Sequence, residues 1–218
     1  MEGFYERRIF PWVLGIADRA FRQQRGEVLA RATGRVLEIG IGTGTSLPFY
    51  TPAVTELVGI EPSEALRRKC QAYAREGSHS VKSLSVQEGD AQALRFADHE
   101  FDSVVAFLVF CTIPDPVAAA KEVFRVLKPG GKLFFFEHVI AETEQMPGDS
   151  VVQHRLANWQ RRWNPLWNKV GCGCHLIRDT RKVFSDQGFQ FEDYSAYRHP
   201  KIIGLVSPVI QGTAIKPL

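Results

Sequence analysis

The chain has 218 residues, of which 44% are hydrophobic and 23% are charged, as expected for one globular domain with a substantial core. Its formal charge of +3 is too weak for a nucleic-acid-binding protein, which would carry a dense basic stripe, so we expect no nucleic-acid partner. The four cysteines form no disulfide-scaffold pattern and favour a reducing compartment, the cytoplasm: Cys70, Cys111, Cys172 and Cys174.

The first 33 residues predict a helical cap on the domain. The most apolar run among them, 9–17, is far shorter than the roughly 20 apolar residues that a membrane span requires. Aromatic and aliphatic residues at 4–14 are interleaved with two arginines. This segment therefore either packs across the substrate mouth, which we favour, or makes peripheral contact with a bilayer surface. An amphipathic helix follows over 16–32.

The stretch 35–44 predicts a buried strand that runs into a Gly-x-Gly-x-Gly turn, the first βα unit of a nucleotide-binding type of fold. Glycines suit a backbone that a ligand must approach closely, here Gly40, Gly42 and Gly44. Their spacing differs from the dinucleotide fingerprint, whose third glycine comes three residues after the second. Glu38 adds a carboxylate, which suits an ammonium better than a pyrophosphate. The inferred cofactor is S-adenosylmethionine, with S-adenosylhomocysteine as its product.

Later strands are predicted to present ligand-binding residues at their carboxyl ends, where parallel sheets of this type bind their ligands. The strands are expected at 57–60, 84–88 and 101–109. The first ends in Glu61 and Pro62, and the Glu61 carboxylate would accept hydrogen bonds from the ribose hydroxyls. After the second, Asp90 would accept from the adenine amino group, with Ala91 as the adjacent backbone donor. The third strand would offer a free carbonyl near Phe107 to the methionine ammonium.

The rest of the chain predicts one α/β domain over residues 1–218: a doubly wound, mostly parallel, seven-stranded Rossmann-like sheet. A helix from Pro116 leads to a turn at 129–131 and a strand at 132–137. A helix at 178–187 and strands near 189–194 and 209–215 suggest a C-terminal antiparallel hairpin. The segment 141–177 breaks this rhythm and predicts an inserted lid over the acceptor, with Trp159, Trp163 and Trp167 as its own small core. The expected parts are a cap (1–33), a cofactor-binding core (34–140), the lid (141–177) and a C-terminal helix and hairpin (178–218).

Five motifs, in order along the chain, resemble those of class I S-adenosylmethionine-dependent methyltransferases: 36–44, Glu61, 89–91, 101–105 and 125–131. Further segments resemble a branch of small stand-alone methyltransferases similar to the animal thiol S-methyltransferases of the methyltransferase-like seven group: 47–50, 111–116, 137–138, 164–167 and 173–176. The animal members carry an N-terminal membrane anchor, whereas this sequence starts almost directly at the helix before the domain. We therefore expect a cytoplasmic protein, with peripheral membrane contact as the alternative.

A methyl acceptor needs alignment with the electrophilic methyl carbon and, if it is a thiol, a base. His138 follows the strand at 132–137 and is the candidate catalytic base, ahead of His154 and His175. The spacing Cys172-x-Cys174-His175 would suit zinc, but a closed site needs four ligands. His154 could add one, yet the sequence has no second Cys or His pair with metal spacing, so no metal is expected. Cys174 is interpreted as a packed small hydrophobe.

The leading hypothesis is methyl transfer to a thiol or another soft nucleophile on a small, apolar acceptor. One alternative is an N- or C-methyltransferase of a lipid headgroup or quinone, and a second is a non-catalytic S-adenosylmethionine-binding protein. The identity of the acceptor and the oligomeric state are left open by the sequence.

Overall fold

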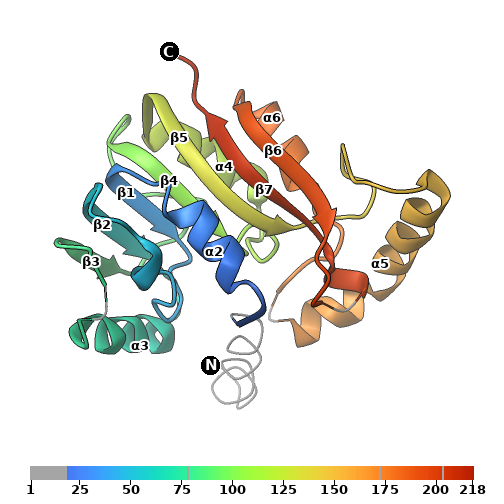
Figure 1. The fold of residues 1–218 in the computed structure, drawn as a ribbon, viewed down its shortest axis with the longest axis horizontal. Coiled ribbons are helices and arrows are strands. Elements are labelled where there is room, and N and C mark those ends of the chain that lie inside the picture. The colour runs from blue at the N-terminus through green and yellow to red at the C-terminus, as the bar shows by residue number, and fades with distance from the viewer. Residues whose placement is uncertain (1–18, 78, 172, 203) are drawn as a thin grey trace.

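A computed structural model describes residues 19–77, 79–171, 173–202 and 204–218. Most of the predicted cap, with its potential membrane contact, and Cys172 lie outside these residues. Seven strands form one sheet in the order β3-β2-β1-β4-β5-β7-β6 (Figure 1). The strands are β1 (Gly34–Ile39), β2 (Val54–Ile60), β3 (Leu84–Gln87), β4 (Phe101–Phe107), β5 (Leu127–His138), β6 (Gln190–Arg198) and β7 (Pro208–Ile215).

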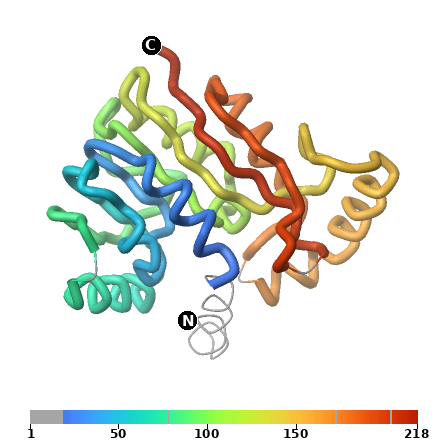
Figure 2. Tube along the Cα trace, in the orientation of Figure 1, coloured from blue at the N-terminus to red at the C-terminus, as the bar shows by residue number. Residues whose placement is uncertain are grey.

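The predicted α/β fold with a C-terminal antiparallel hairpin is confirmed. Strands β1 to β5 pair in parallel, and β7 is antiparallel to both β5 and β6. The tube in Figure 2 shows the last strand lying between β5 and β6. The helices and short 3-10 turns are α2 (Arg22–Leu29), η2 (Leu47–Phe49), α3 (Glu64–Arg75), α4 (Pro116–Val126), α5 (Ser150–Val170), α6 (Thr180–Asp186) and η3 (Gly204–Val206).

Helices cover both faces of the sheet because successive strand residues point to opposite sides. Val36 belongs to a core that includes Val28 and Leu29 of α2, whereas its neighbour Leu37 belongs to a core that includes residues of α4 and α6, Val123 and Phe184 among them. In Figure 1, α2 accordingly crosses the front of the sheet and α4 lies behind it. Strands buried on both faces explain the continuous apolar runs in the sequence.

The predicted turn at 129–131 belongs to a strand instead. Residues 130–131 bond to Lys216 near the C-terminal end of the sequence. The Gly130 N–H donates to the Lys216 carbonyl at 2.8 Å, and the Lys216 N–H donates to the Gly131 carbonyl at 3.0 Å. Gly130 has a φ of +74°. The irregular backbone that glycine permits is therefore part of β5, and this strand begins at Leu127 rather than at the predicted Lys132.

The segment after β5 is dominated by one helix, and the prediction that its tryptophans form a small core is wrong. Helix α5 has 21 residues with Pro165 inside it, and its buried residues are Ala157 and Gln160. Trp159 and Trp163 are 52% and 41% exposed, so they do not form a core, and only Trp167 is partly buried. The helix is tied down by a polar residue, Gln160, rather than by aromatic packing.

Gln160 holds α5 against the end of β5 and against η3. Its side-chain carbonyl accepts from the Ala141 N–H at 2.8 Å, and its amide donates to the carbonyls of Val139 at 3.1 Å and Leu205 at 2.9 Å. The side chain is fully buried. These bonds place the helix beside the carboxyl end of β5, the edge where the predicted site lies.

Candidate functional site

The glycine turn after β1 needs glycine for conformation and for space. Gly40, Gly42 and Gly44 all have positive φ, at +67°, +58° and +85°. A Cβ on Gly40 would come 2.6 Å from Cγ2 of Val109, and one on Gly44 would come 2.9 Å from Sγ of Cys70. Nothing closer than 3.8 Å would meet a Cβ on Gly42, so its conformation alone selects glycine there.

Glu61, at the end of β2, braces this turn. One carboxylate oxygen accepts from the Gly42 N–H at 3.2 Å, and the other accepts from the Ser63 N–H at 3.0 Å. Arg67 donates to the Glu61 backbone carbonyl at 2.7 Å and fixes the chain as it enters α3. The residue is only 7% exposed. Each carboxylate oxygen accepts more than one hydrogen bond, so the group can hold the turn and still bind hydroxyls.

A cavity of about 180 Å³ brings together five of the predicted cofactor residues. Its lining includes Gly40, Glu61, Pro62, Asp90 and Ala91. It lies at the carboxyl ends of β1 and β2, as expected for a sheet of this class. A cavity of about 420 Å³ lies at the opposite edge, and no predicted site residue lines it.

Asp90 is engaged by a residue that the sequence did not single out. Both of its carboxylate oxygens accept from the Gln92 side-chain amide, at 2.9 and 3.1 Å, and one also accepts from the Gln92 N–H. The Gln92 side-chain carbonyl in turn accepts from the Asp115 N–H at 2.9 Å. Gln92 therefore links the β3 and β4 sides of the cavity.

Glu38 and Phe107 lie on the other side of the glycine turn, under α2. The Glu38 carboxylate is 2% exposed and accepts from the Tyr50 hydroxyl at 2.9 Å. Burial, and then the Glu38 charge, raise the pKa of Tyr50 well above its usual value, so the phenol stays a donor. Arg25 of α2 stacks over the Phe107 ring at 4.1 Å and donates to Ser46 Oγ at 2.8 Å.

Arg25 and Tyr50 therefore contact residues of the predicted site, and the sequence analysis assigned neither of them a role there. Tyr50 was signalled only as part of the 47–50 motif, and Arg25 only as one arginine of an amphipathic helix. The turn fits a ligand such as S-adenosylmethionine, because it lies between buried carboxylates able to accept from hydroxyl and ammonium groups.

The chain turns sharply where β4 ends, and Glu137 holds that turn. Leu108 has a φ of +57°, uncommon for a residue with a side chain, and its N–H donates to the Phe136 carbonyl at 2.7 Å. The fully buried Glu137 carboxylate accepts from the N–H groups of Val109 at 2.9 Å and Phe110 at 3.1 Å. Burial raises the pKa of Glu137 to about 7.

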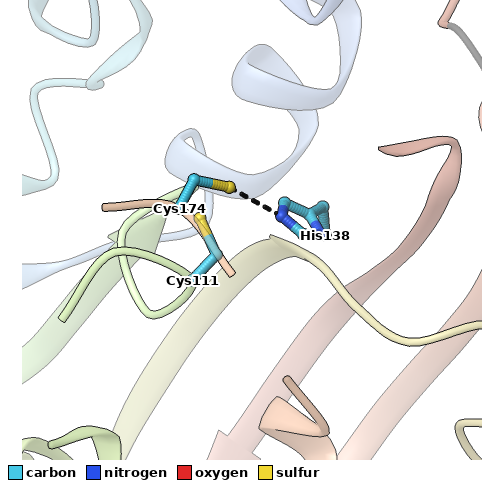
Figure 3. Close-up of side chains that lie close together, drawn as sticks. All are labelled: Cys111, His138 and Cys174. Atoms are coloured by element: carbon cyan, nitrogen blue, oxygen red, sulfur yellow. Dashed lines mark hydrogen bonds between the residues drawn. The ribbon is translucent and has the colours of Figure 1, made fainter. Parts of the chain in front are cut away.

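His138 meets two cysteines from distant parts of the chain. Figure 3 shows Cys111, His138 and Cys174 converging, with His138 Nε2 at 2.9 Å from Cys174 Sγ. The donor atoms of all three lie within 4.8 Å of one another. Cys111 is 3% and His138 5% exposed, and Cys174 is partly buried. Cys174 is thus no simple packed hydrophobe, contrary to the interpretation from the sequence.

Hydrogen bonds and charges within this cluster shift the pKa values of all three side chains. A hydrogen bond from Cys111 and the charge of His138 lower the pKa of Cys174, whereas the same bond and burial raise the pKa of Cys111. Burial alone would lower the pKa of His138, but the neighbouring Cys174 raises it. These directions favour the thiolate form of Cys174 and the protonated form of His138.

The other candidate histidines lie differently. His154 Nδ1 bonds to Glu142 at 2.5 Å on the exposed side of α5, so it adds no donor to the cysteines. His175 takes part through its backbone, since its N–H donates to the Cys111 carbonyl at 2.8 Å. Burial and then the charge of Arg178 lower the pKa of its imidazole.

Comparison with known proteins agrees with this arrangement. A methyltransferase-domain family model matches residues 37–135. The chain belongs to the class I S-adenosylmethionine-dependent methyltransferases, and its cofactor is S-adenosylmethionine. It is similar to thiol S-methyltransferase TMT1B of Rattus norvegicus, at 33% identity over 83% of this chain and 70% of the relative. It is also similar to phosphatidylethanolamine N-methyltransferase of Cereibacter sphaeroides, at 37% identity over 66% of this chain and 68% of the relative.

Solved structures share the fold. An S-adenosylmethionine-dependent methyltransferase from Methanosarcina mazei superposes with a TM-score of 0.66 at 21% identity, covering 88% of this chain and 96% of that one. The N-methyltransferase NodS from Bradyrhizobium japonicum, in complex with S-adenosylhomocysteine, gives 0.63 at 16% identity, covering 93% and 87%. None of the helices in the described residues combines the length and apolarity needed to cross a membrane.

Proposed function

We propose that this methyltransferase methylates the thiol of a small, apolar acceptor. The observation that carries the proposal is the reach of its similarity to a thiol S-methyltransferase, which extends over 83% of the chain, against 66% for the phospholipid N-methyltransferase. The family model ends at residue 135, before the cysteine–histidine cluster is complete. The longer match therefore takes in sequence beyond the cofactor-binding core, where an acceptor would be selected.

The cofactor contacts follow from the strand ends. Glu61 is proposed to hold the ribose, with Pro62 beside it, and Asp90 and Ala91 the adenine. Glu38 and the carbonyl at Phe107 would face the methionine ammonium, which a buried carboxylate stabilises. The sulfonium supplies an intrinsically electrophilic methyl group.

The chain's own part in the reaction is then to orient the acceptor and keep water out. Phe107 stacks on Phe136 with ring centroids 4.8 Å apart, and Phe21 packs edge-on against Phe136 at 5.1 Å. These rings are buried, so they hold the ends of β4 and β5 together beside the proposed acceptor pocket. The residues before Arg22 and the segment 141–177 are proposed to complete the acceptor pocket, because residues 173–176 contact the turn after β4.

His138 remains the proposed catalytic residue, acting through its partner. Its Nε2 is directed at Cys174 Sγ, and its Nδ1 is buried with no partner among the described residues. A direct proton transfer from the acceptor to Nε2 would have to displace Cys174. We therefore propose that His138 acts on the acceptor as a member of the cluster rather than as an isolated base.

A matched set of acceptors tests the proposal. Purified enzyme with methyl-labelled S-adenosylmethionine would be offered an aromatic thiol, the phenol and aniline of the same skeleton, and phosphatidylethanolamine vesicles, with the products identified by mass spectrometry. We expect methyl transfer to the thiol at least 100-fold faster than to the phenol or the aniline. Transfer confined to the vesicles would instead establish the second candidate, an N-methyltransferase of a phospholipid headgroup, which the Cereibacter relative favours.

A further inference from the structure

The three residues Cys111, His138 and Cys174 form a donor set that the methyltransferase fold does not require. They come from the turn after β4, the last position of β5 and the loop between α5 and α6. Two cysteine sulfurs and one imidazole nitrogen lie within 4.8 Å of one another. Thiolate and imidazole are the ligands that zinc prefers in proteins, and three protein ligands leave a fourth position open.

We propose that Cys111, His138 and Cys174 bind a thiophilic divalent cation, zinc in particular, as an open three-ligand site. In a tetrahedral zinc site the bonds are about 2.3 Å to sulfur and about 2.0 Å to nitrogen, which sets the ligand atoms roughly 3.5–3.8 Å apart. The separation of 2.9 Å between His138 Nε2 and Cys174 Sγ would need to widen by less than an ångström. Side-chain rotation can supply that change, because the three backbone segments are already in place.

The backbone that carries the ligands is tied together. The His175 N–H donates to the Cys111 carbonyl at 2.8 Å, and Arg178 donates to the Ile113 carbonyl at 2.8 Å. The Leu176 N–H donates to the Asn164 side chain at 2.8 Å, which anchors the loop to α5. These bonds hold Cys174 against the turn that carries Cys111. A preorganised donor set of this kind loses little conformational entropy when it binds a cation.

The burial of the cluster favours a bound cation as well. Cys111 and His138 are 3% and 5% exposed and Cys174 is partly buried, so water reaches the three donor atoms poorly. Metal ions bind cysteine as the thiolate and histidine as the neutral imidazole, so a divalent ion would release protons from the cluster as it binds.

The open position would lie beside the cofactor cavity. Val109 and Thr112 line that cavity, and Cys111 belongs to the same turn. A thiol acceptor could then bind the metal as a thiolate and release its proton to water. The methyl group would replace that proton on sulfur, and adenosylhomocysteine would be the leaving group. This last step rests on the proposed function, whereas the metal site does not.

Metal content tests the site without reference to activity. Reduced full-length protein, purified without a metal-binding tag, would be loaded with zinc or cobalt(II), and bound metal would be counted by mass spectrometry. We expect about one equivalent in the wild type, and at least tenfold weaker binding in Cys111→Ser, Cys174→Ser and His138→Gln. Cys70→Ser, a buried cysteine outside the cluster, should bind metal as the wild type does.

X-ray absorption of the zinc-loaded wild type covers the case in which a variant fails to fold. Two sulfur ligands and at least one nitrogen ligand are expected. The proposal is overturned if reduced wild-type protein takes up no metal, if the metal has no sulfur ligand, or if folded cluster variants bind it as tightly as the wild type. Adding an aromatic thiol, but not its phenol, should shift the cobalt absorption bands. Metal binding without this shift would keep the site and remove its role in holding the acceptor.

Discussion

Replacing Glu61 with alanine should weaken cofactor binding and lower stability together, because one carboxylate serves both. The bonds from the Gly42 and Ser63 N–H groups would be lost at a site only 7% exposed. Hydrogen bonds to charged groups contribute about 1.5–3 kcal/mol each, so two that are partly replaced by water would cost about 2–3 kcal/mol. At about 2–4 °C per kcal/mol for a chain of this size, Tm should fall by about 5–10 °C.

Glu61→Ala should also remove the hydrogen bonds that the ribose hydroxyls donate to the carboxylate, which weakens cofactor binding in addition to lowering Tm. One charge-assisted bond is enough for a tenfold change, since 1.4 kcal/mol corresponds to a factor of ten. We expect S-adenosylhomocysteine to bind Glu61→Ala 10- to 100-fold more weakly in calorimetric titration at 25 °C. Glu61→Gln keeps one acceptor oxygen and should fall between the alanine variant and the wild type.

Glu88→Gln is the matched control. The Glu88 side chain is 78% exposed and pairs with Arg67 at 3.1 Å, so the same charge is removed close to Glu61 without a change in the glycine turn. Its affinity should stay within about twofold of wild type. A folded Glu61→Ala protein that binds S-adenosylhomocysteine as tightly as the control would refute the ribose assignment.

Three further changes probe other parts of the molecule. Gly40→Ala forces a Cβ to 2.6 Å from Val109 and should weaken S-adenosylhomocysteine binding more than tenfold in titration. Gly77→Ala is the control, because Gly77 has a φ of +72° and a Cβ there would meet nothing within 4 Å. It should cost about 1–2 kcal/mol of backbone strain and leave the affinity for S-adenosylhomocysteine unchanged. Glu122→Gln should destabilise by about 1 kcal/mol in urea unfolding at pH 7. The hydrogen bond from Arg125 lowers the pKa of Glu122, so the Glu122 carboxylate stabilises the fold above the usual carboxyl pKa. The difference in unfolding free energy between wild type and variant should vanish as the pH falls through the lowered pKa of Glu122. An equal difference at neutral and at acidic pH would contradict this reasoning. Gln160→Leu leaves three backbone groups unpaired and should speed proteolysis around α5 with cofactor affinity kept; unchanged cleavage would show that other contacts hold the helix.

The cofactor half of the molecule was predictable because its signals are local. A strand, its glycine turn and the acidic residue after the next strand are each read within a few residues, and the structure places Gly40 and Glu61 on one cavity as expected. The neighbours that orient these groups were not predictable. Tyr50 reaches Glu38 from 12 residues away, and Arg25 reaches Ser46 from 21.

The cysteine–histidine cluster was hidden for the same physical reason. The sequence drew attention to Cys172-x-Cys174-His175 because adjacent spacing is visible in one dimension. The structure brings Cys111 beside His138 because β4 and β5 are neighbours in the sheet, and it pairs His138 with Cys174, 36 residues later, through the loop between α5 and α6. The prediction for the tryptophans failed because an aromatic-rich stretch is typical of a core, whereas Trp159 and Trp163 are exposed on α5.

The place of β7 in the sheet has a consequence for biosynthesis. Among the described strands, β6 pairs only with β7, and β7 also pairs with β5. Residues 190–198 therefore emerge from the ribosome before the strand with which they pair. The order β3-β2-β1-β4-β5 can assemble during synthesis, since chains fold from the N-terminus as they are made. The edge of β5 then stays open as a template for stray strands until residues 208–215 arrive. A ribosome stalled before residue 208 would therefore hold a nascent chain that has its glycine turn but an incomplete sheet with an unpaired edge.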